Sequence, residues 1–208
     1  DSKSAVRTKA VYAFSRFSKG ITGQSIDALK SIIQEDPSFN VVSAAMTRLA
    51  DLDSIEVMNF ARSLEKQNIN GLNVAIADVY SRFGEVQDYQ FLENLNLNGK
   101  LNGYDQLRGM LSYTYFITRQ DIDLMEKSLA VYSYLTASGN MYVKWYLSGA
   151  IEYNISILSD KSAALEIQIS EDETAKAYEA MNIKKALKQR YDDLIANLSP
   201  LIEVESGN

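Results

Sequence analysis

The sequence predicts an all-α fold, an α-α superhelix in which antiparallel helix pairs stack on one another. Apolar residues recur at spacings of three and four through most of the 208 residues, which is the period of an amphipathic helix. Only two prolines, Pro37 and Pro200, interrupt this pattern. A segment near the start of the chain also recurs 35 residues later, which indicates an internal repeat.

Two apolar stripes predict the first two helices. The first stripe is Val6, Ala10, Val11, Phe14 and Phe17, and the second is Ile26, Leu29, Ile32 and Ile33. We expect Gly20 and Gly23 to end the first helix. The second should stop before the segment EDPS, where Asp36 is expected to cap a third helix with Pro37 at its first position.

The third helix repeats the first. The segment DPSFNVVSAAMTRLAD, aligned beneath DSKSAVRTKAVYAFSR, places Val41 under Val6 and Ala45 under Ala10. A small residue returns in a third unit as Ala75. Small side chains let neighbouring helices approach closely, so these alanines are expected at helix contacts.

A fourth and a fifth helix continue the series. Asp53 is expected to start the fourth, with Glu56 three residues on as in a capping box. After the turn KQNING the stripe of the first helix returns in Leu72, Ala75, Ile76, Val79, Tyr80 and Phe83. Units of about 30–40 residues with two helices each are typical of HEAT-like or armadillo-like solenoids, because one pair cannot cover its own apolar faces.

The segment NLNLNGKLNG, residues 94–103, breaks the pattern. A turn-rich loop is the preferred interpretation, and a short hairpin around the Asn-Gly pair is the alternative. Longer and less regular helices are predicted over 104–118, 121–138, 141–158 and about 170–197. We thus expect a single helical-repeat domain over 1–208, with regular repeats over about 1–93, the loop at 94–103 and irregular helices over 104–198.

The spacing of polar residues predicts where these later helices begin and end. Thr118 with Asp121, and Ser170 with Glu173, are spaced as capping boxes. The acidic residues 171–173 would then occupy a first helical turn, where they suit the helix dipole better than a metal site. Pro200 is expected to stop the last helix, which would close the stack.

The composition excludes several classes of site. The chain contains no His and no Cys, so a Ser-His-Asp triad, an H-E-x-x-H zinc site, a zinc finger and a disulfide are impossible within it. Carboxylate, Lys, Tyr or Ser chemistry remains possible, but these residues show no catalytic arrangement and the sequence has no glycine-rich phosphate-binding loop. We therefore expect no catalytic residue, metal ligand or cofactor in this chain. The net charge of −6 disfavours nucleic acid as a partner. No apolar run approaches the ~18 residues of a membrane span, which predicts a soluble chain.

Aromatic residues are concentrated in the segment VYSYLTASGNMYVKWYLSGAIEYNI. Such side chains suit a binding surface, but helix packing is the preferred explanation for most of them. The predicted buried stripe is Val143, Leu147, Ala150, Ile151 and Leu158, with Tyr146 and Tyr153 beside it. Trp145 lies outside the stripe next to Lys144, and both are candidates for lining a surface groove.

Arg108 and Arg119 bracket an apolar helical stretch that contains Tyr113, Tyr115 and Phe116, and a guanidinium beside tyrosine hydroxyls could hold a peptide carboxylate. The competing interpretation is an arginine whose aliphatic stem lies over its own helix. Together with Lys144 and Trp145, Arg108 and Tyr113 complete the set of candidates for contact with a peptide or a protein partner.

The helix pairs that begin with VRTKAVYAFSRF and DPSFNVVSAAMTRLAD, followed by longer irregular helices and a closing helix, resemble the HEAT-like carboxyl-terminal domain of zinc aminopeptidases related to aminopeptidase N. The resemblance extends from Asp1 to about Leu198 and is one of pattern. It implies an accessory domain that closes over a thermolysin-like catalytic domain and shapes the chamber for the peptide. Zinc and its H-E-x-x-H ligands would then belong to the parent protein.

Two functions remain open at this point. The first is the non-catalytic domain of such an aminopeptidase, with the catalytic domain of the same polypeptide as its partner. The first residues of the chain are polar and resemble the DPSFN segment between repeats, which suggests that earlier repeats or a catalytic domain precede Asp1. The alternative is a free-standing HEAT-type scaffold that binds a protein or peptide.

Overall fold

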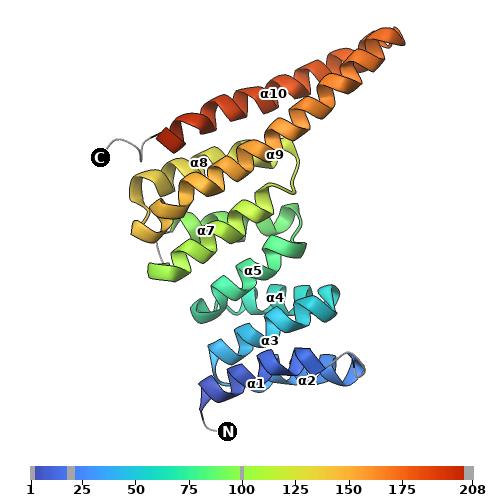
Figure 1. Cartoon of the computed structure of the whole chain (residues 1–208). Coiled ribbons are helices and arrows are strands. Elements are labelled where there is room, and N and C mark those ends of the chain that lie inside the picture. The colour runs from blue at the N-terminus through green and yellow to red at the C-terminus, as the bar shows by residue number, and fades with distance from the viewer. Residues whose placement is uncertain (1–2, 18–21, 99–100, 204–208) are drawn as a thin grey trace. The chain divides into compact units, whose positions relative to one another are not determined.

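All regular structure in the described part of the chain is helical. The computed structural model describes residues 3–17, 22–98 and 101–203, and no strand occurs in these ranges (Figure 1). This confirms the predicted all-α class. The chain divides into two compact units, Asp1–Leu92 and Glu93–Asn208. No helix in the described ranges is long and apolar enough to cross a lipid bilayer.

The first unit is a series of paired helices. Its elements are α1 (Ser4–Phe17), α2 (Thr22–Glu35), α3 (Phe39–Leu52), α4 (Ser54–Lys66), α5 (Asn73–Phe83) and the 3₁₀ turns η2 (Asn70–Leu72) and η3 (Val86–Asp88), and α6 (Tyr89–Leu97) begins in it. The starts of α1, α3 and α5 lie 35 and 34 residues apart. Helix α3 contacts α1, α2, α4 and α5, so it is the central helix of this unit.

Apolar residues of α3 and α5 form a large part of the core of the first unit, to which α2 and α4 also contribute Leu29, Val57 and Ala61. Ala45 and Ala75 are both buried at helix contacts, as the repeat predicts. Met46, Leu49, Ile76 and Tyr80 have no exposed surface. These positions follow the helical period of the sequence, so the hydrophobic pattern alone identifies this part of the core.

The predicted stripe of α1 is only partly correct. Val11 is buried, but Val6 is 47% exposed and Ala10 is exposed as well. The side chains of residues 14–17 lie outside the described residues. Arg7 turns inward instead, and its Nε and Nη2 donate to the Asp36 carboxylate at 2.7 and 3.0 Å.

The predicted cap at Asp36 is wrong. Helix α3 begins two residues after Pro37, with Ser38 at the N-cap position. The Asp36 carboxylate accepts the backbone N–H of Ser38 at 2.9 Å as well as the two bonds from Arg7. A charged partner 29 residues away thus holds Asp36 in the connection between two helices. Gly23 lies in the first turn of α2 and does not end α1, and Gly20 lies outside the described residues.

The predicted start of α4 is confirmed. Asp53 is the N-cap residue, and its carboxylate accepts the backbone N–H of Glu56 at 3.0 Å. The second half of the predicted capping box is not formed, because the Asp53 N–H donates to the Leu49 carbonyl and the Glu56 carboxylate forms an ion pair with Lys30 at 3.2 Å. The cap therefore also lies beside a contact between α2 and α4.

The second unit contains four long helices. These are α7 (Gly103–Ile117), α8 (Ile122–Ser138), α9 (Met141–Thr174) and α10 (Tyr178–Glu203). Helix α9 contacts each of the other three. At the start of α8, Asp121 alone caps the helix by accepting Leu124 N–H at 3.2 Å. The predicted capping box is wrong, because Thr118 Oγ1 donates instead to the Tyr115 carbonyl.

The loop predicted at residues 94–103 begins too early. Helix α6 continues to Leu97, and no hairpin occurs in the part of this segment that the structure describes. Leu95 and Asn96 are both buried, and Asn96 Nδ2 donates to the Gly109 carbonyl at 3.3 Å. The alternation of polar and apolar residues misled the prediction because this asparagine points inward.

The boundary predicted between the last two helices is also wrong. Helix α9 does not stop at 158 but runs to Thr174, and α10 begins at Tyr178. Ser170 and Glu173 therefore lie in the last turn of α9, where acidic charge does not suit the helix dipole. Asp172 gains an ion pair with Lys184 across the hairpin at 2.7 Å. Helix α10 continues through Pro200 to Glu203, with Leu198 fully buried two residues before the proline.

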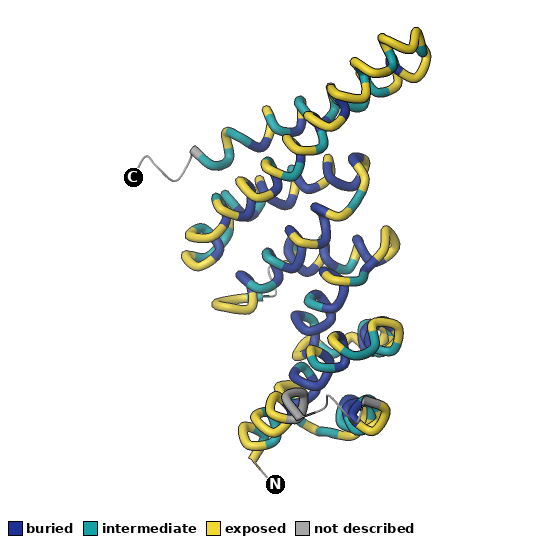
Figure 2. The backbone as a smooth tube through the Cα atoms, turned by 45° about the vertical axis from the view of Figure 1, so that its right-hand side comes forward, coloured by how far each residue is buried: buried dark blue, intermediate teal, exposed yellow. Residues whose placement is uncertain are grey.

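The antiparallel hairpin of α9 and α10 packs through a seven-residue repeat. Buried and half-buried positions alternate at spacings of four and three in both helices, which is the pattern of a coiled-coil seam. They are Leu158, Ser162, Leu165, Ile169 and Asp172 in α9, Ala177 in the turn, and Met181, Lys184, Lys188, Tyr191, Ile195 and Leu198 in α10. The distal half of the hairpin extends beyond α7 and α8 and is largely exposed (Figures 1 and 2).

Polar pairs fix the register of this hairpin. Ser162 Oγ donates to Asp192 at 2.6 Å, and Lys188 Nζ donates to the same carboxylate at 2.8 Å. These bonds satisfy polar groups inside a seam that would otherwise be apolar. The Lys188–Asp192 bond lies within α10, but the Ser162–Asp192 bond and the Lys184–Asp172 ion pair join the two helices. A shift of either helix along the other would break these two contacts, so they favour one alignment.

Candidate functional site

Large side chains gather on the outward side of the first half of α9. The buried stripe of this helix contains Val143, Leu147, Ala150, Ile151 and Leu158, as predicted. The opposite side carries Met141, Tyr142, Trp145, Tyr146 and Tyr153, which are 44–73% exposed. Packing within the chain therefore does not explain these aromatic residues, and the prediction that it explains most of them is wrong for this helix.

Helix α7 contributes one more ring to this surface. Tyr115 is 53% exposed, and its ring contacts that of Tyr153 edge to face, with centroids 5.8 Å apart. Such pairs are favourable by about 0.5–1.5 kcal/mol beyond the area they bury, so the two rings restrain each other. We call the six residues Tyr115, Met141, Tyr142, Trp145, Tyr146 and Tyr153 the aromatic face.

The structure separates the four candidate contact residues of the sequence. Trp145 is 73% exposed at the centre of the aromatic face, and the half-buried Lys144 lies beside it on α9. Arg108 is half-buried on α7. Tyr113 has no exposed surface, because its ring packs edge to face on Tyr132 with centroids 6.0 Å apart. A peptide therefore cannot reach Tyr113, and this candidate is wrong.

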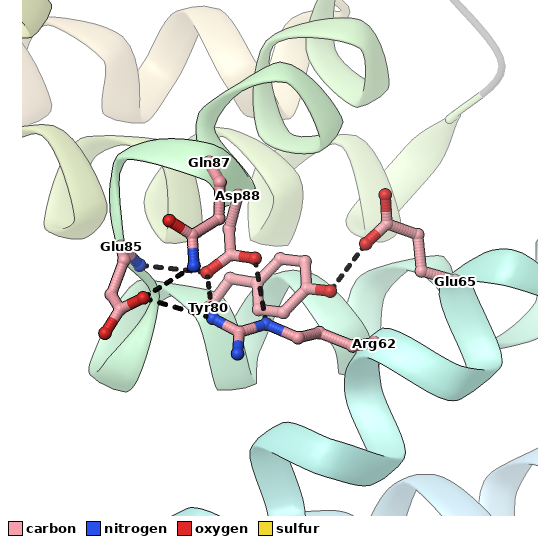
Figure 3. A network of polar contacts seen from close by, with 6 residues as sticks. All are labelled: Arg62, Glu65, Tyr80, Glu85, Gln87 and Asp88. Atoms are coloured by element: carbon pink, nitrogen blue, oxygen red, sulfur yellow. Dashed lines mark hydrogen bonds and ion pairs between the residues drawn. The ribbon is translucent and has the colours of Figure 1, made fainter.

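A second cluster, in the first unit, is a network of polar side chains that the sequence did not predict (Figure 3). Arg62 on α4 donates to both oxygens of the buried Asp88 carboxylate, at 3.3 and 3.2 Å. Asp88 also accepts the backbone N–H of Glu85 at 2.9 Å. The spacing of Glu85 and Asp88, as in a capping box, was the available signal. Nearby, Tyr80 on α5 donates its hydroxyl to Glu65 at 2.5 Å.

The chemistry of this network is structural. Burial first, and then the bond to Glu65, raises the pKa of Tyr80, so the phenol stays protonated and serves as a hydrogen-bond donor. The bond to Asp88 raises the pKa of Arg62. All charged groups of the network are thus partnered within it, and it ties α4 to α5 and η3.

The described residues offer no cluster of three or more acidic side chains that could hold a metal ion. The acidic residues at the end of α9 include Asp172, which is bound to Lys184. The aromatic face, which presents exposed rings, is therefore the best candidate for a functional site in the described part of the chain.

Comparison of the chain with protein-family models, with curated proteins and with solved structures yields no match. The functional argument therefore depends on the sequence and on the geometry described above.

The stability of the chain is expected to depend on pH only outside the neutral range. Hydrogen bonds from Arg7, Arg190 and Lys188 lower the pKa of Asp36, Glu126 and Asp192 respectively. A lowered carboxyl pKa stabilises the fold above the unfolded value of about 4, and this contribution is lost as the pH falls through the folded pKa.

At the alkaline end, burial raises the pKa of Tyr132 to about 12. This contribution is complete below the unfolded pKa of about 10 and is lost as the pH rises through the folded pKa. Because the chain has no His, thermal melts should show a plateau between about pH 5 and 9. A step in the melting temperature near pH 6–7 would contradict this expectation.

Proposed function

We propose that the chain is a non-catalytic helical-repeat domain of a zinc-dependent aminopeptidase, an α-solenoid of the HEAT type that closes over the catalytic domain and shapes the peptide chamber. The observation that carries the proposal is the regular series of helix pairs in the first unit. Its odd-numbered helices start 35 and 34 residues apart, and α3 contacts both α1 and α5. Contact between successive repeats is how solenoids stabilise each pair.

The composition supports a proposal in which catalysis belongs to a different domain from this chain. A chain without His cannot supply an H-E-x-x-H motif, so the proposal assigns zinc and the hydrolytic residues to a catalytic domain of the same polypeptide. The longer helices of the second unit correspond to the irregular helices and closing helix on which the resemblance also rests. This chain then contributes walls and contact surface to the peptide chamber, with no chemistry of its own.

The test is the reading frame that encodes the chain together with the activity of its product. We expect an H-E-x-x-H helix to be encoded upstream of Asp1, and we expect the full polypeptide to bind zinc and release amino-terminal residues from peptides. A reading frame without that motif would overturn the proposal. A matched full-length variant with both motif histidines replaced by Ala should lose zinc while retaining the helical circular dichroism of this chain.

The alternative is a free-standing scaffold, and the aromatic face is the observation that favours it. Exposed aromatic residues supply much of the binding energy at protein interfaces. Under this alternative, the chain should form a stoichiometric complex with a protein that has no linked protease domain, detectable by gel filtration. Truncation of Trp145 should weaken that complex.

A further inference from the structure

We propose that the outer face of α1 and α2 is a stacking surface for a further helix pair of the same repeat type, supplied by the segment of the polypeptide that precedes α1. These two helices lie at the end of the first unit that is farthest from α5 (Figure 1). The proposal depends only on the geometry of the repeats, so it holds whether or not the polypeptide is an aminopeptidase. Three observations carry it: an exposed stripe on α1, a cavity between α1 and α2, and the packing of α2 on the next pair.

The outer face of α1 is an apolar stripe. Val6, Ala10 and Ala13 are exposed and lie within about 60° of one another around the helix, given an angular step of about 100° per residue. The buried Val11 lies at least about 100° away from each of them. Lys9 is at the edge of the stripe, where its charged end can stay in water. The terminal repeat of a solenoid normally presents a polar outer face, so an apolar stripe is not expected there.

The equivalent stripe of α3 packs on the preceding helix pair. The 35-residue shift assigns Val41, Ala45 and Arg48 to the same positions of α3. Val41 is 1% exposed and lines a cavity with residues of α1 and α2, and the Arg48 guanidinium lies over the Tyr12 ring of α1, 5.0 Å from its centroid. Val6, the counterpart of Val41, is 47% exposed. The side of α3 that α1 and α2 cover is thus the side of α1 that no described helix covers.

A cavity between α1 and α2 opens at this face, because Ala10 is both exposed and part of its lining. Its volume is about 230 Å³, and its lining residues are Arg7, Ala10, Val11, Ile32, Asp36 and Val41. Arg7 and Asp36 form an ion pair at 2.7 Å, so the remaining lining is apolar. An apolar cavity of about 150 Å³ can hold benzene, so this one has room for a large apolar side chain.

The next pair shows what fills such a space. Ile33 of α2 is buried and lines a pocket together with Val42 of α3 and Leu64 of α4. Lys30 of α2 also forms an ion pair with Glu56 of α4 at 3.2 Å. By the same geometry, the second helix of a preceding pair would place an apolar side chain between α1 and α2. A second copy of the chain would instead set one α1 stripe against another, which is not a contact of this repeat series.

Duplication of one repeat tests this surface. An added copy of residues 1–35, placed directly before Asp1 of the full chain, keeps the 35-residue spacing and supplies a helix pair that packs on α3 in the natural chain. The matched control is the same extended chain with Val6→Glu and Ala13→Glu in the original copy, which place charge on the stripe. Both positions are exposed, so these substitutions alone should leave the melting temperature of the natural chain unchanged.

We expect the added copy to fold and stack, so the mean residue ellipticity at 222 nm should equal that of the natural chain. Trypsin should remove the added copy roughly tenfold more slowly than it does in the control, because a stacked helix pair opens less often. Removal at equal rates from the two extended chains would overturn the proposal.

The natural polypeptide provides a second test. We expect the roughly 35 residues encoded before Asp1 to form an amphipathic helix pair, since the repeats are 35 and 34 residues long. A reading frame without such a pair there contradicts the proposal, whereas a reading frame that has the pair but no H-E-x-x-H motif contradicts only the proposed function.

Sedimentation velocity of the natural chain tests a second copy as the occupant. At about 100 µM a complex with micromolar Kd is largely associated. We expect Val6→Glu with Ala13→Glu to leave the sedimentation coefficient unchanged. A dimer that these substitutions abolish would assign the stripe to a second copy of the chain and would refute the stacking of a preceding pair.

Discussion

Replacement of Leu49 with Ala is expected to lower the free energy of unfolding by about 2–5 kcal/mol. Leu49 has no exposed surface and lies on α3, the central helix of the first unit. Its truncation removes apolar contacts and leaves a cavity that the surrounding helices can fill only in part. Because a typical domain is stable by only about 5–15 kcal/mol, the loss is a large share of the total.

Urea unfolding followed by far-UV circular dichroism measures this effect. Ile55→Ala is the matched control, since Ile55 is 73% exposed on the neighbouring helix α4. The control should change the free energy of unfolding by less than about 0.5 kcal/mol. If Leu49→Ala changed the free energy of unfolding as little as the control does, the role of α3 as the central packing helix would be wrong.

Truncation of Tyr132 to Ala is expected to cost about 3–5 kcal/mol in the second unit. The ring is fully buried and packs edge to face on Tyr113. The hydroxyl lies between α7 and α9: it donates to Thr114 Oγ1 at 3.1 Å and accepts from Asn154 Nδ2 at 3.2 Å. Thr114 and Asn154 are buried, so loss of the hydroxyl removes a hydrogen-bond partner from each in a place that water does not reach.

Tyr132→Phe separates the two contributions, because it keeps the ring and removes only the hydroxyl. We expect it to cost about 1–3 kcal/mol, the range for loss of a partner to a buried polar group. Tyr153→Phe is the matched control at a position that is 44% exposed, and it should be nearly neutral. A neutral Tyr132→Phe would show that the buried hydrogen bonds contribute nothing net to stability.

The parts of the fold that could be predicted are those that depend on local sequence. The apolar period identified α3, α5 and the buried stripe of α9, and Asp53 marked the start of α4 through a bond to a residue three positions away. In each case the side chains that decide the structure lie within one or two helical turns. Such signals are visible in a single sequence.

The failures depend on partners that are distant in the sequence. Asp36 has the residue type of a helix cap, but Arg7 holds it in the connection between helices. Helix α9 continues past residue 158 because residues beyond that point bind to α10: Ser162 donates to Asp192, and Asp172 pairs with Lys184. No local pattern reports that such partners exist.

The candidate site was predictable only in part, for a related reason. Periodicity assigned Trp145 correctly to the side of α9 away from the core, but it placed Tyr146 and Tyr153 in packing contacts. Whether another element covers the second side of a helix is a property of the tertiary arrangement. Tyr113 was misjudged in the opposite sense, because Tyr132 covers it.

Because the seam of the α9–α10 hairpin repeats every seven residues, the hairpin can be shortened in steps of seven residues in each helix. Removal of one heptad from each helix between Leu158 and the turn at Ala175–Ala177 would return every remaining seam position to an equivalent neighbour. Each such step shortens the hairpin by about 10 Å, since a helix rises about 1.5 Å per residue. The reach of the hairpin can therefore be changed while the body formed by α7, α8 and the first half of α9 stays the same.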